Sequence, residues 1–405
     1  MKKLFLLMVL TSLVIGSLFA GGTRCKAMGD VSSLIDSKNI STYPQRLINY
    51  SSCLWLVQTD KEDVYGNVTT SHSSGVRYMI KENYAIQINA AKGENKGTAN
   101  WDYNYQSLTA YNRLNVVLAT KMAGFDLGFK VKLFSNSTYD KEKTIVDSTT
   151  TNNTELDLKI RYYDFGFGLT KDLDSNKFFD MSLDFGIGSW DGSYTVNDSD
   201  YFEYGQYEND GWSNLKFNGR YYVKGETVDY TSYVGYGFNS KKQTRPFNED
   251  LTGKYEDSDW NILGGIGIHL KPVKGVKVYN DIELSYRKVN DNYDDNDSNN
   301  DNETIETDSY RSLLPTYKVG AELCHKFNED KFFELIKFRG GFNRSFTKHS
   351  YTYEDYNSEG EGFMRSYDNE IKMTYGVAIH KHNFSLEFTG TTADVFTLQG
   401  TYFFK

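Results

Sequence analysis

The stretch VKVYNDIELSYRK, residues 276–288, alternates between two kinds of side chain. A period of two predicts a β-strand with two distinct faces, because successive side chains of a strand point to opposite sides. In a soluble protein the apolar face would meet a core. In a membrane barrel it would meet lipid, and the charged face would line a water-filled lumen. One face carries Val276, Val278, Asn280, Ile282, Leu284 and Tyr286, and the other carries Lys277, Tyr279, Asp281, Glu283, Ser285 and Arg287.

The same alternation recurs along the chain in segments of about 9–13 residues, which matches the ~9–11 residues of a tilted membrane strand. One segment, LDLKIRYYDFGFGL (156–169), breaks the alternation, and a β-bulge near Tyr162–Tyr163 would restore it. The regular segments are FDLGFKVKL (125–133), FDMSLDFGI (179–187), LKFNGRYYVK (215–224), WNILGGIGIHL (260–270) and IKMTYGVAI (371–379).

Short and long connections alternate between these segments. Tight turns at one end and long polar loops at the other are typical of an outer-membrane barrel, whereas a soluble sandwich has no reason to sort its loops in this way. The short connections lie at 81–83, 121–122, 172–176, 225–226, 271–275, 328–330 and 381–383. The long ones lie near 59–73, 93–107, 135–155, 189–213, 239–258, 289–312 and 345–369.

These patterns predict an all-β protein, a transmembrane antiparallel up-and-down β-barrel with short periplasmic turns and long surface loops. Counting from 50–58 to 394–404 gives about sixteen strands, with fourteen as the fallback. The composition agrees, because 32 Tyr, 26 Phe and 34 Gly against only 4 Pro suit long hydrogen-bonded ladders. The mean hydropathy of −0.59 does not argue against a membrane protein, since alternating faces cancel in the average.

The N-terminal sequence MKKLFLLMVLTSLVIGSLFAGG predicts a secretory signal peptide over residues 1–20. Lys2 and Lys3 form its basic start, and Ala20 is a small residue at the cleavage position, although cleavage as late as Gly22 also fits. A membrane anchor is the alternative, but the apolar run is shorter than the ~20 residues that a spanning helix needs.

Residues 23–49 precede the first predicted strand. We expect them to form either a periplasmic lead-in or a plug in the lumen of a barrel that spans residues 50–404. In an oxidising periplasm, Cys25 and Cys53 would be able to form a disulfide that leaves Cys324 free. Three small buried thiols are the equal alternative.

The mature sequence as a whole resembles the Gram-negative outer-membrane β-barrels. Its closing Phe403–Phe404 resembles the aromatic end that the barrel-assembly machinery reads in this class, although Lys405 displaces the aromatic residue from the final position. The resemblance implies the outer membrane of a Gram-negative bacterium as the location.

A shorter resemblance covers only residues 23–50, which look like the lead-in of barrels related to the long-chain fatty-acid transporter family. In that family the segment plugs the lumen and gates hydrophobic substrates, so the resemblance implies a plug here, against the plainer alternative of a periplasmic lead-in. This sequence departs from the family where Tyr43 replaces an Asn and where the Gly-Gly-Ala that often follows is absent. The matching residues are Arg24, Ala27-Met28-Gly29, Asp36 and Tyr43-Pro44.

The polar faces of the predicted strands would line the lumen, where water solvates charges that would be costly against lipid. Opposed cations and carboxylates would then set a transverse field that selects solutes. The alternative is that the charges pair across neighbouring strands and help to fill the interior. The predicted lumen charges are Arg77, Lys130, Lys132, Lys159, Arg161, Lys216, Arg220, Lys277, Asp281, Glu283, Arg287, Glu322, Lys337 and Arg339.

All charged residues in the segment DNYDDNDSNNDNETIETD (291–308) are acidic, and the segment is a candidate calcium-binding site. Its oxygen-bearing side chains fall at the positions of a calcium-binding loop, but Asn300 replaces the usual Gly and no helices flank it. A solvated surface loop is the alternative. The candidate ligands are Asp295, Asp297, Asn299, Asp301 and Glu306.

No enzyme is expected, because none of the 6 His is spaced to pair with a nucleophile or a carboxylate. A basic nucleic-acid patch, a Gly-rich phosphate loop and a CxxC pair are also absent from the sequence. Apart from calcium, no cofactor is expected.

The sequence therefore favours a porin-type channel for passive diffusion of small hydrophilic solutes. One alternative is a surface structural or interaction barrel with a closed lumen that acts through acidic loops. Another is a hydrophobic-substrate transporter gated by the N-terminal segment. The expected partners are outer-membrane lipid or lipopolysaccharide, the barrel-assembly machinery and small solutes, with no prediction of the oligomeric state.

Overall fold

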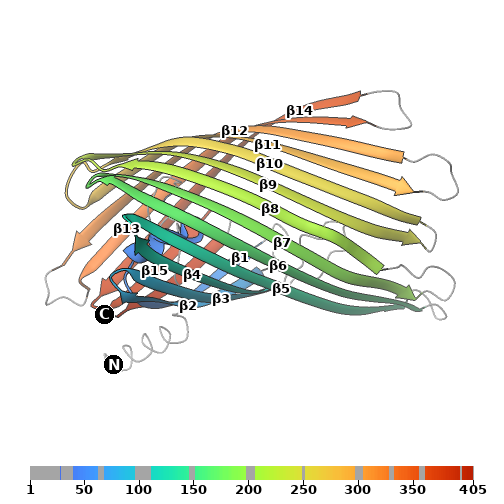
Figure 1. Ribbon diagram of the computed structural model, residues 1–405, viewed down its shortest axis with the longest axis horizontal. Coiled ribbons are helices and arrows are strands. Elements are labelled where there is room, and N and C mark those ends of the chain that lie inside the picture. The colour runs from blue at the N-terminus through green and yellow to red at the C-terminus, as the bar shows by residue number, and fades with distance from the viewer. Residues whose placement is uncertain are drawn as a thin grey trace.

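The described residues of the computed structural model form one closed antiparallel barrel of sixteen strands (Figure 1). Each strand pairs with its neighbours in the chain, and β1 closes the ring against β16, from Cys53↔Phe403 to Lys61↔Val395. The structure describes residues 28, 40–62, 68–95, 111–145, 151–197, 206–248, 251–296, 304–327, 333–354, 361–392 and 395–404.

Short connections join the strands in pairs at one end of the barrel. In the tight turn between β4 and β5, Ala123 and Gly124 have φ angles of 54° and 78°, as the hairpin turns that match strand twist require. The strands are β1 Cys53–Glu62, β2 Val68–Lys81, β3 Tyr84–Asn95, β4 Tyr111–Met122, β5 Phe125–Ile145, β6 Thr151–Asp174, β7 Lys177–Asn197, β8 Gln206–Val223, β9 Val228–Asn248, β10 Leu251–Leu270, β11 Val276–Asn296, β12 Thr304–Lys326, β13 Leu335–Glu354, β14 Glu361–Lys381, β15 Phe384–Thr391 and β16 Val395–Phe403.

The apolar face of β11 points outward and its charged face points into the barrel. Ile282 and Leu284 are 68% and 52% exposed, whereas Asp281, which directly precedes Ile282, is 0% exposed. A soluble protein buries the apolar side of its strands, so this inversion identifies the outer wall as a lipid-facing surface.

The outward apolar side chains form a belt of nearly constant height. On β5 the belt runs from Phe125 to Leu133, and on β7 it runs from Phe179 to Ile187. Nine residues with a rise of ~3.3 Å and a tilt of ~40° cover about 23 Å, close to the apolar height of outer-membrane barrels.

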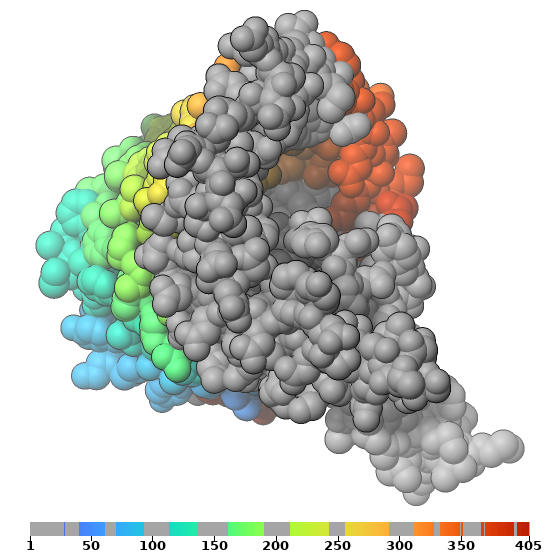
Figure 2. All heavy atoms as spheres, turned by 90° about the vertical axis from the view of Figure 1, so that its right-hand side faces the viewer, coloured from blue at the N-terminus to red at the C-terminus, as the bar shows by residue number. Residues whose placement is uncertain are grey.

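The barrel wall has two heights (Figure 1). Strands β5–β14 are 18–24 residues long and form a high wall. Strands β15, β16 and β1–β4 are 8–14 residues long and form a low wall. Figure 2 faces the ends of the long strands and shows a hollow bordered by the orange and red C-terminal strands.

The high wall corrects the predicted loop lengths. Much of 135–155 and 189–213, expected as polar loops, belongs to strands β5–β8. Once a strand leaves the bilayer, water meets both of its faces, so the alternation that reveals a membrane strand is lost while the backbone ladder continues.

Two further points of the sequence analysis can be compared with the described residues. The β-bulge near Tyr162–Tyr163 is absent, because β6 pairs with β5 in one uninterrupted register from Thr151 to Thr170. Cys53 is a free, buried thiol and Cys324 is free as well, so of the two alternatives for Cys53 the structure has the unpaired thiol.

One helix of the described residues, the 3₁₀-helix η2 (Pro44–Asn49), packs against β3–β6. In this part of the chain, no helix combines the length and the apolar character that crossing a bilayer would require.

Replacing Ile282 by Lys tests the direction of the apolar belt. A cation near the middle of the lipid-facing surface should lower the free energy of unfolding by roughly 2–4 kcal/mol. The measurement is urea unfolding of the refolded protein in lipid vesicles. The matched control is Ser285→Lys on the lumen face, where water solvates the cation, and equal losses for both variants would contradict the assignment.

Candidate functional site

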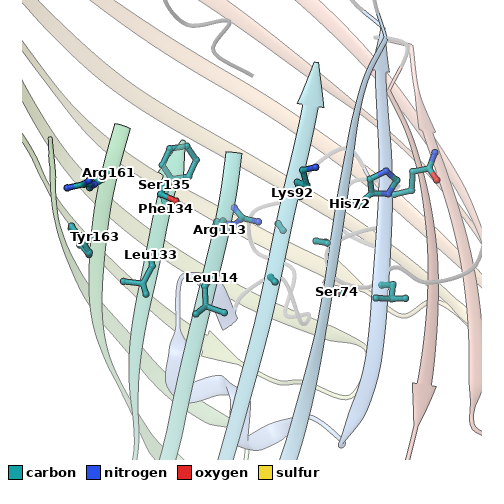
Figure 3. A pocket seen from close by; sticks show the side chains of 15 residues that line it. His72, Ser74, Lys92, Arg113, Leu114, Leu133, Phe134, Ser135, Arg161 and Tyr163 are labelled. Atoms are coloured by element: carbon teal, nitrogen blue, oxygen red, sulfur yellow. The ribbon is translucent and has the colours of Figure 1, made fainter. Parts of the chain in front are cut away.

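The helix η2 occupies the lumen near the short turns, and five consecutive residues from Pro44 to Ile48 are buried. Pro44 begins the helix at a position where its missing N–H costs nothing and its fixed φ suits the first turn. The amide of Arg46 donates to the carbonyl of Tyr43 at 3.0 Å, which closes that turn. Figure 3 shows this segment as faint blue ribbon behind the wall strands.

A pair of glycines on the wall forms the seat of this helix. Gly128 of β5 and Gly168 of β6 are directly paired. A Cβ on Gly128 would lie 2.0 Å from the backbone nitrogen of Gln45, and one on Gly168 would lie 1.8 Å from its side-chain oxygen. Only glycine therefore allows η2 to approach the wall this closely. Gln45 Nε2 also donates to the carbonyl of Leu169 at 3.1 Å.

The opposite side of the helix rests on a small apolar patch. This patch is a cluster of buried aliphatic side chains from the N-terminal segment and from the inner faces of β3 and β4. Burying such groups removes them from the water of the lumen and stabilises the closed arrangement. The cluster consists of Ile40, Leu47, Ile48, Ala85, Val117 and Ala119.

A buried carboxylate joins the helix to the wall electrostatically. Asp180 of β7 is 0% exposed. Arg46 Nε donates to its Oδ1 at 2.9 Å, and Arg220 Nη2 of β8 donates to its Oδ2 at 2.6 Å. Thr170 Oγ1 donates to Oδ1 at 2.5 Å. The Arg46 guanidinium also stacks over the Phe178 ring, 3.7 Å from its centroid.

A second cation ties the segment just before η2 to the wall. Lys130 Nζ donates to the carbonyl of Ser41 at 2.8 Å and lies 2.7 Å from Asp184 Oδ1. Lys130 on β5 reaches Asp184 on β7 across Gly166 of β6, where a Cβ would fall 2.2 Å from the carboxylate oxygen. The missing side chain thus opens the path between the two charges.

The N-terminal segment also touches the far side of the ring. Met28 is fully buried, and a Cβ on Gly320 of β12 would lie 2.7 Å from Met28 Cβ. Strand β12 lies across the barrel from β4–β6, so the described parts of this segment contact both sides of the lumen. We call Met28 together with residues 40–50 the plug.

Ion pairs line the remainder of the buried lumen. Lys318 lies 2.9 Å from Glu283, and Lys132 lies 2.7 Å from Asp164. Arg339 bridges two carboxylates, with Nε at 2.9 Å from Glu322 and Nη1 at 2.7 Å from Glu387. Charges in a low-dielectric interior need partners of this kind, because an unpaired one would be strongly destabilising.

Most of the predicted lumen charges lie on the inner face of the barrel, and many of them are paired rather than open to a channel. Arg77 donates to Gln87 at 3.0 Å, and Arg287 pairs with Asp259 at 2.8 Å. The alternation of their strands also places Lys216, Lys277 and Lys337 on the lumen face. The buried members are Arg77, Lys130, Arg220, Asp281, Glu322 and Arg339.

The structure corrects the predicted position of Arg161. Without the expected bulge it shares the outward face of β6 with Tyr163 and Phe165, both of which are exposed. Only the backbone of the strand is described at Lys159. The calcium candidates Asp297, Asn299 and Asp301 lie outside the described residues, so calcium binding stays a prediction.

Sequence reasoning missed the residues that organise the plug. Arg46 was a single cation in a lead-in without alternation, and Asp164 was not among the predicted lumen charges. The glycines that seat the helix carried no signal, because close backbone approach depends on the three-dimensional arrangement. One signal in the sequence could have indicated the plug. The Pro44–Arg46 segment combines a helix-starting proline with a cation, and it precedes strands whose predicted lumen faces are rich in carboxylates.

No protein-family model matches the chain, and no curated protein sequence matches it either. Solved structures do match. A Pseudomonas aeruginosa FadL homologue is 11% identical and has a TM-score of 0.50, with 95% of this chain and 98% of that one covered. The Ralstonia pickettii toluene transporter TbuX is 12% identical and has a TM-score of 0.44, with 96% of this chain and 99% of that one covered.

The chain has the fold of a Gram-negative outer-membrane β-barrel. The likeness at such low identity concerns the fold alone, and the outward apolar belt agrees with it. A closed barrel of sixteen strands with an apolar belt belongs in the outer membrane, since spanning strands satisfy their backbone hydrogen bonds only in closed form.

Replacing Asp180 by Asn tests the buried charge cluster. The substitution leaves Arg46 and Arg220 without their shared carboxylate, and removing one member of a buried ion pair typically costs about 3–5 kcal/mol. The measurement is the free energy of unfolding in urea from lipid vesicles. Asp259→Asn is the control, because its partner Arg287 is half exposed and such pairs contribute about 0–1 kcal/mol. Similar losses for both variants would rule out a special role for Asp180.

Proposed function

We propose that this barrel is a gated outer-membrane transporter for small hydrophilic solutes, closed at rest by its plug. The single observation that carries the proposal is the Arg46–Asp180–Arg220 cluster, in which one carboxylate of the wall is shared between the wall and the N-terminal segment. Ion pairs and the close approach at Gly128 and Gly168 hold this segment inside the lumen without a covalent bond to the wall, so it could close the lumen and still be displaced.

The polar character of the lumen supports hydrophilic cargo. Farther from the short turns than the plug, Lys216 and Asn261 are exposed on the lumen face. On β15 and β16 the inward side chains include Thr389, Thr397 and Thr401. Hydroxyl and charged groups replace the hydrogen bonds that a polar solute gives up when it leaves water.

Gating distinguishes this proposal from an open porin. A barrel of about sixteen strands encloses an aqueous channel when its lumen is empty. Here Lys130, Arg220, Asp180 and Asp281 are all buried, so the described lumen is filled near the short turns. Solute would pass there only after the plug has moved.

A hydrophobic-substrate transporter is the second candidate, and the apolar patch beneath η2 favours it. Displacing the helix would uncover Ala85, Val117 and Ala119 inside the lumen, an apolar surface on which a hydrophobic molecule would rest. The same plug would serve either cargo, so the two candidates differ in the substrate and not in the gate.

The Gly128→Val variant tests the gate. Its side chain would occupy the position of the Gln45 backbone and expel η2, while a β-branched residue suits the strand. We expect the mean single-channel conductance in a planar bilayer to rise about tenfold or more, because an emptied barrel of this size conducts.

Gly264→Val is the matched control, because a Cβ at Gly264 has no atom within 4 Å. Equal currents for Gly128→Val and the wild-type protein would contradict the gate. Liposome swelling with sugars or amino acids, set against uptake of oleate by the same Gly128→Val vesicles, then separates the hydrophilic cargo from the hydrophobic one.

A further inference from the structure

Two rows of side chains cross the outer face of β1–β6 at the upper border of the apolar belt. The backbone registers align Gln58 with His72, His72 with Lys92, and Ser135 with Arg161. We call His72, Lys92 and Arg161 the basic row. The row beneath it, two residues nearer the short turns, contains Leu56, Ser74, Ala90, Leu114, Leu133 and Tyr163.

A cavity of about 840 Å³ lies between these rows and is lined by both. Figure 3 shows two tiers, with Arg161, Lys92 and His72 in the upper one and Tyr163, Leu133 and Leu114 in the lower one. The cavity therefore has a basic rim above an apolar floor.

Its position relative to the membrane follows from the belt. Leu133 is the last apolar residue of the belt on β5, and Ser135 begins the polar part of the same face. The short turns lie at the other end of these strands, so the basic row lies at the border of the outer leaflet. Lipid phosphates lie at this height, directly above the acyl chains.

We propose that this cavity binds a phosphorylated glycolipid of the outer leaflet, the lipid A part of lipopolysaccharide. One of its two phosphates would meet Lys92 and the other would meet Arg161, three strands away, where an ammonium offers a point charge and a guanidinium offers paired donors. One acyl chain would lie along Leu114 and Leu133, which are 38% and 40% exposed. The volume suits a phosphate with part of one chain, since ligand cavities commonly measure about 300–1,000 Å³.

The barrel itself supplies a matched control. Lys288 of β11 and Arg311 of β12 lie on the outer face on the opposite side of the ring, where they pair across neighbouring strands. They carry the same two charges as Lys92 and Arg161, so a comparison separates a specific site from general attraction of a basic surface to an anionic membrane.

The experiment is native mass spectrometry of the full chain in detergent, titrated with diphosphoryl lipid A. The wild-type protein should retain one lipid A at low ligand excess. Lys92→Glu/Arg161→Glu should weaken its retention roughly thirty-fold, as the usual effect of two cations near an anionic lipid surface predicts. Lys288→Glu/Arg311→Glu should change it less than about threefold. Equal losses for the two double variants would overturn the proposal.

Two further measurements test the lipid and the fold. Leu114→Asn/Leu133→Asn should weaken lipid A retention, and a large excess of inorganic pyrophosphate should not displace lipid A from the wild-type protein. Full displacement by pyrophosphate would reduce the cavity to an anion site and overturn the lipid assignment. Folding is checked for each variant by heat-modifiable electrophoretic mobility, and Lys92→Gln/Arg161→Gln replaces the charge reversal if that variant does not fold.

Discussion

The pairing of β1 with β16 is the constraint on which the rest of the structure depends. Hydrocarbon offers no hydrogen-bond partner, so a sheet in a bilayer must close on itself or leave costly unpaired groups. The register from Cys53↔Phe403 to Lys61↔Val395 provides this closure. Once the ring is closed, alternation leaves no freedom of placement, because every second side chain meets lipid and every other one meets the interior.

The interior must therefore accommodate all the charge that the lipid excludes. Near the short turns this is done by pairing, as Asp180 with two arginines and Arg339 with two carboxylates illustrate. The glycines complete the arrangement, because charges on β5 and β7 meet only where Gly166 leaves the space between them open. Packing and electrostatics inside the barrel are thus set by the same few positions.

The fold could be predicted from the sequence because, in a membrane strand, the alternation of apolar and polar residues indicates which face each residue occupies. Ile282 and Asp281 differ in exposure as their alternation indicated, and the sixteen strands follow from the same pattern. The predictions fail where this alternation ends. Beyond the bilayer, polar strands resemble loops. At the border of the belt, Arg161 was predicted to face the lumen with the help of a β-bulge, but the strand has no bulge there and Arg161 faces outward.

The plug was less predictable because its contacts are non-local and use residue types with weak signals. Pro44 and Arg46 lie more than a hundred residues from Gly168 and Asp180 in the chain, and no periodicity connects them. The resemblance of residues 23–50 to a transporter lead-in supplied the idea of a plug. The structure supplied the partners of its described residues, Met28 and residues 40–50.

A single layer of sheet separates the plug from the outer cavity, since η2 packs on β3–β6 and the cavity lies on β1–β6. On β4, Val117 is fully buried beneath the plug, whereas Leu118 beside it is 48% exposed to lipid. Neighbouring residues thus belong to different environments, and a substitution acts on one face without touching the other. Gating inside the lumen and lipid binding outside it are for this reason separable by mutation, although the same strands support both.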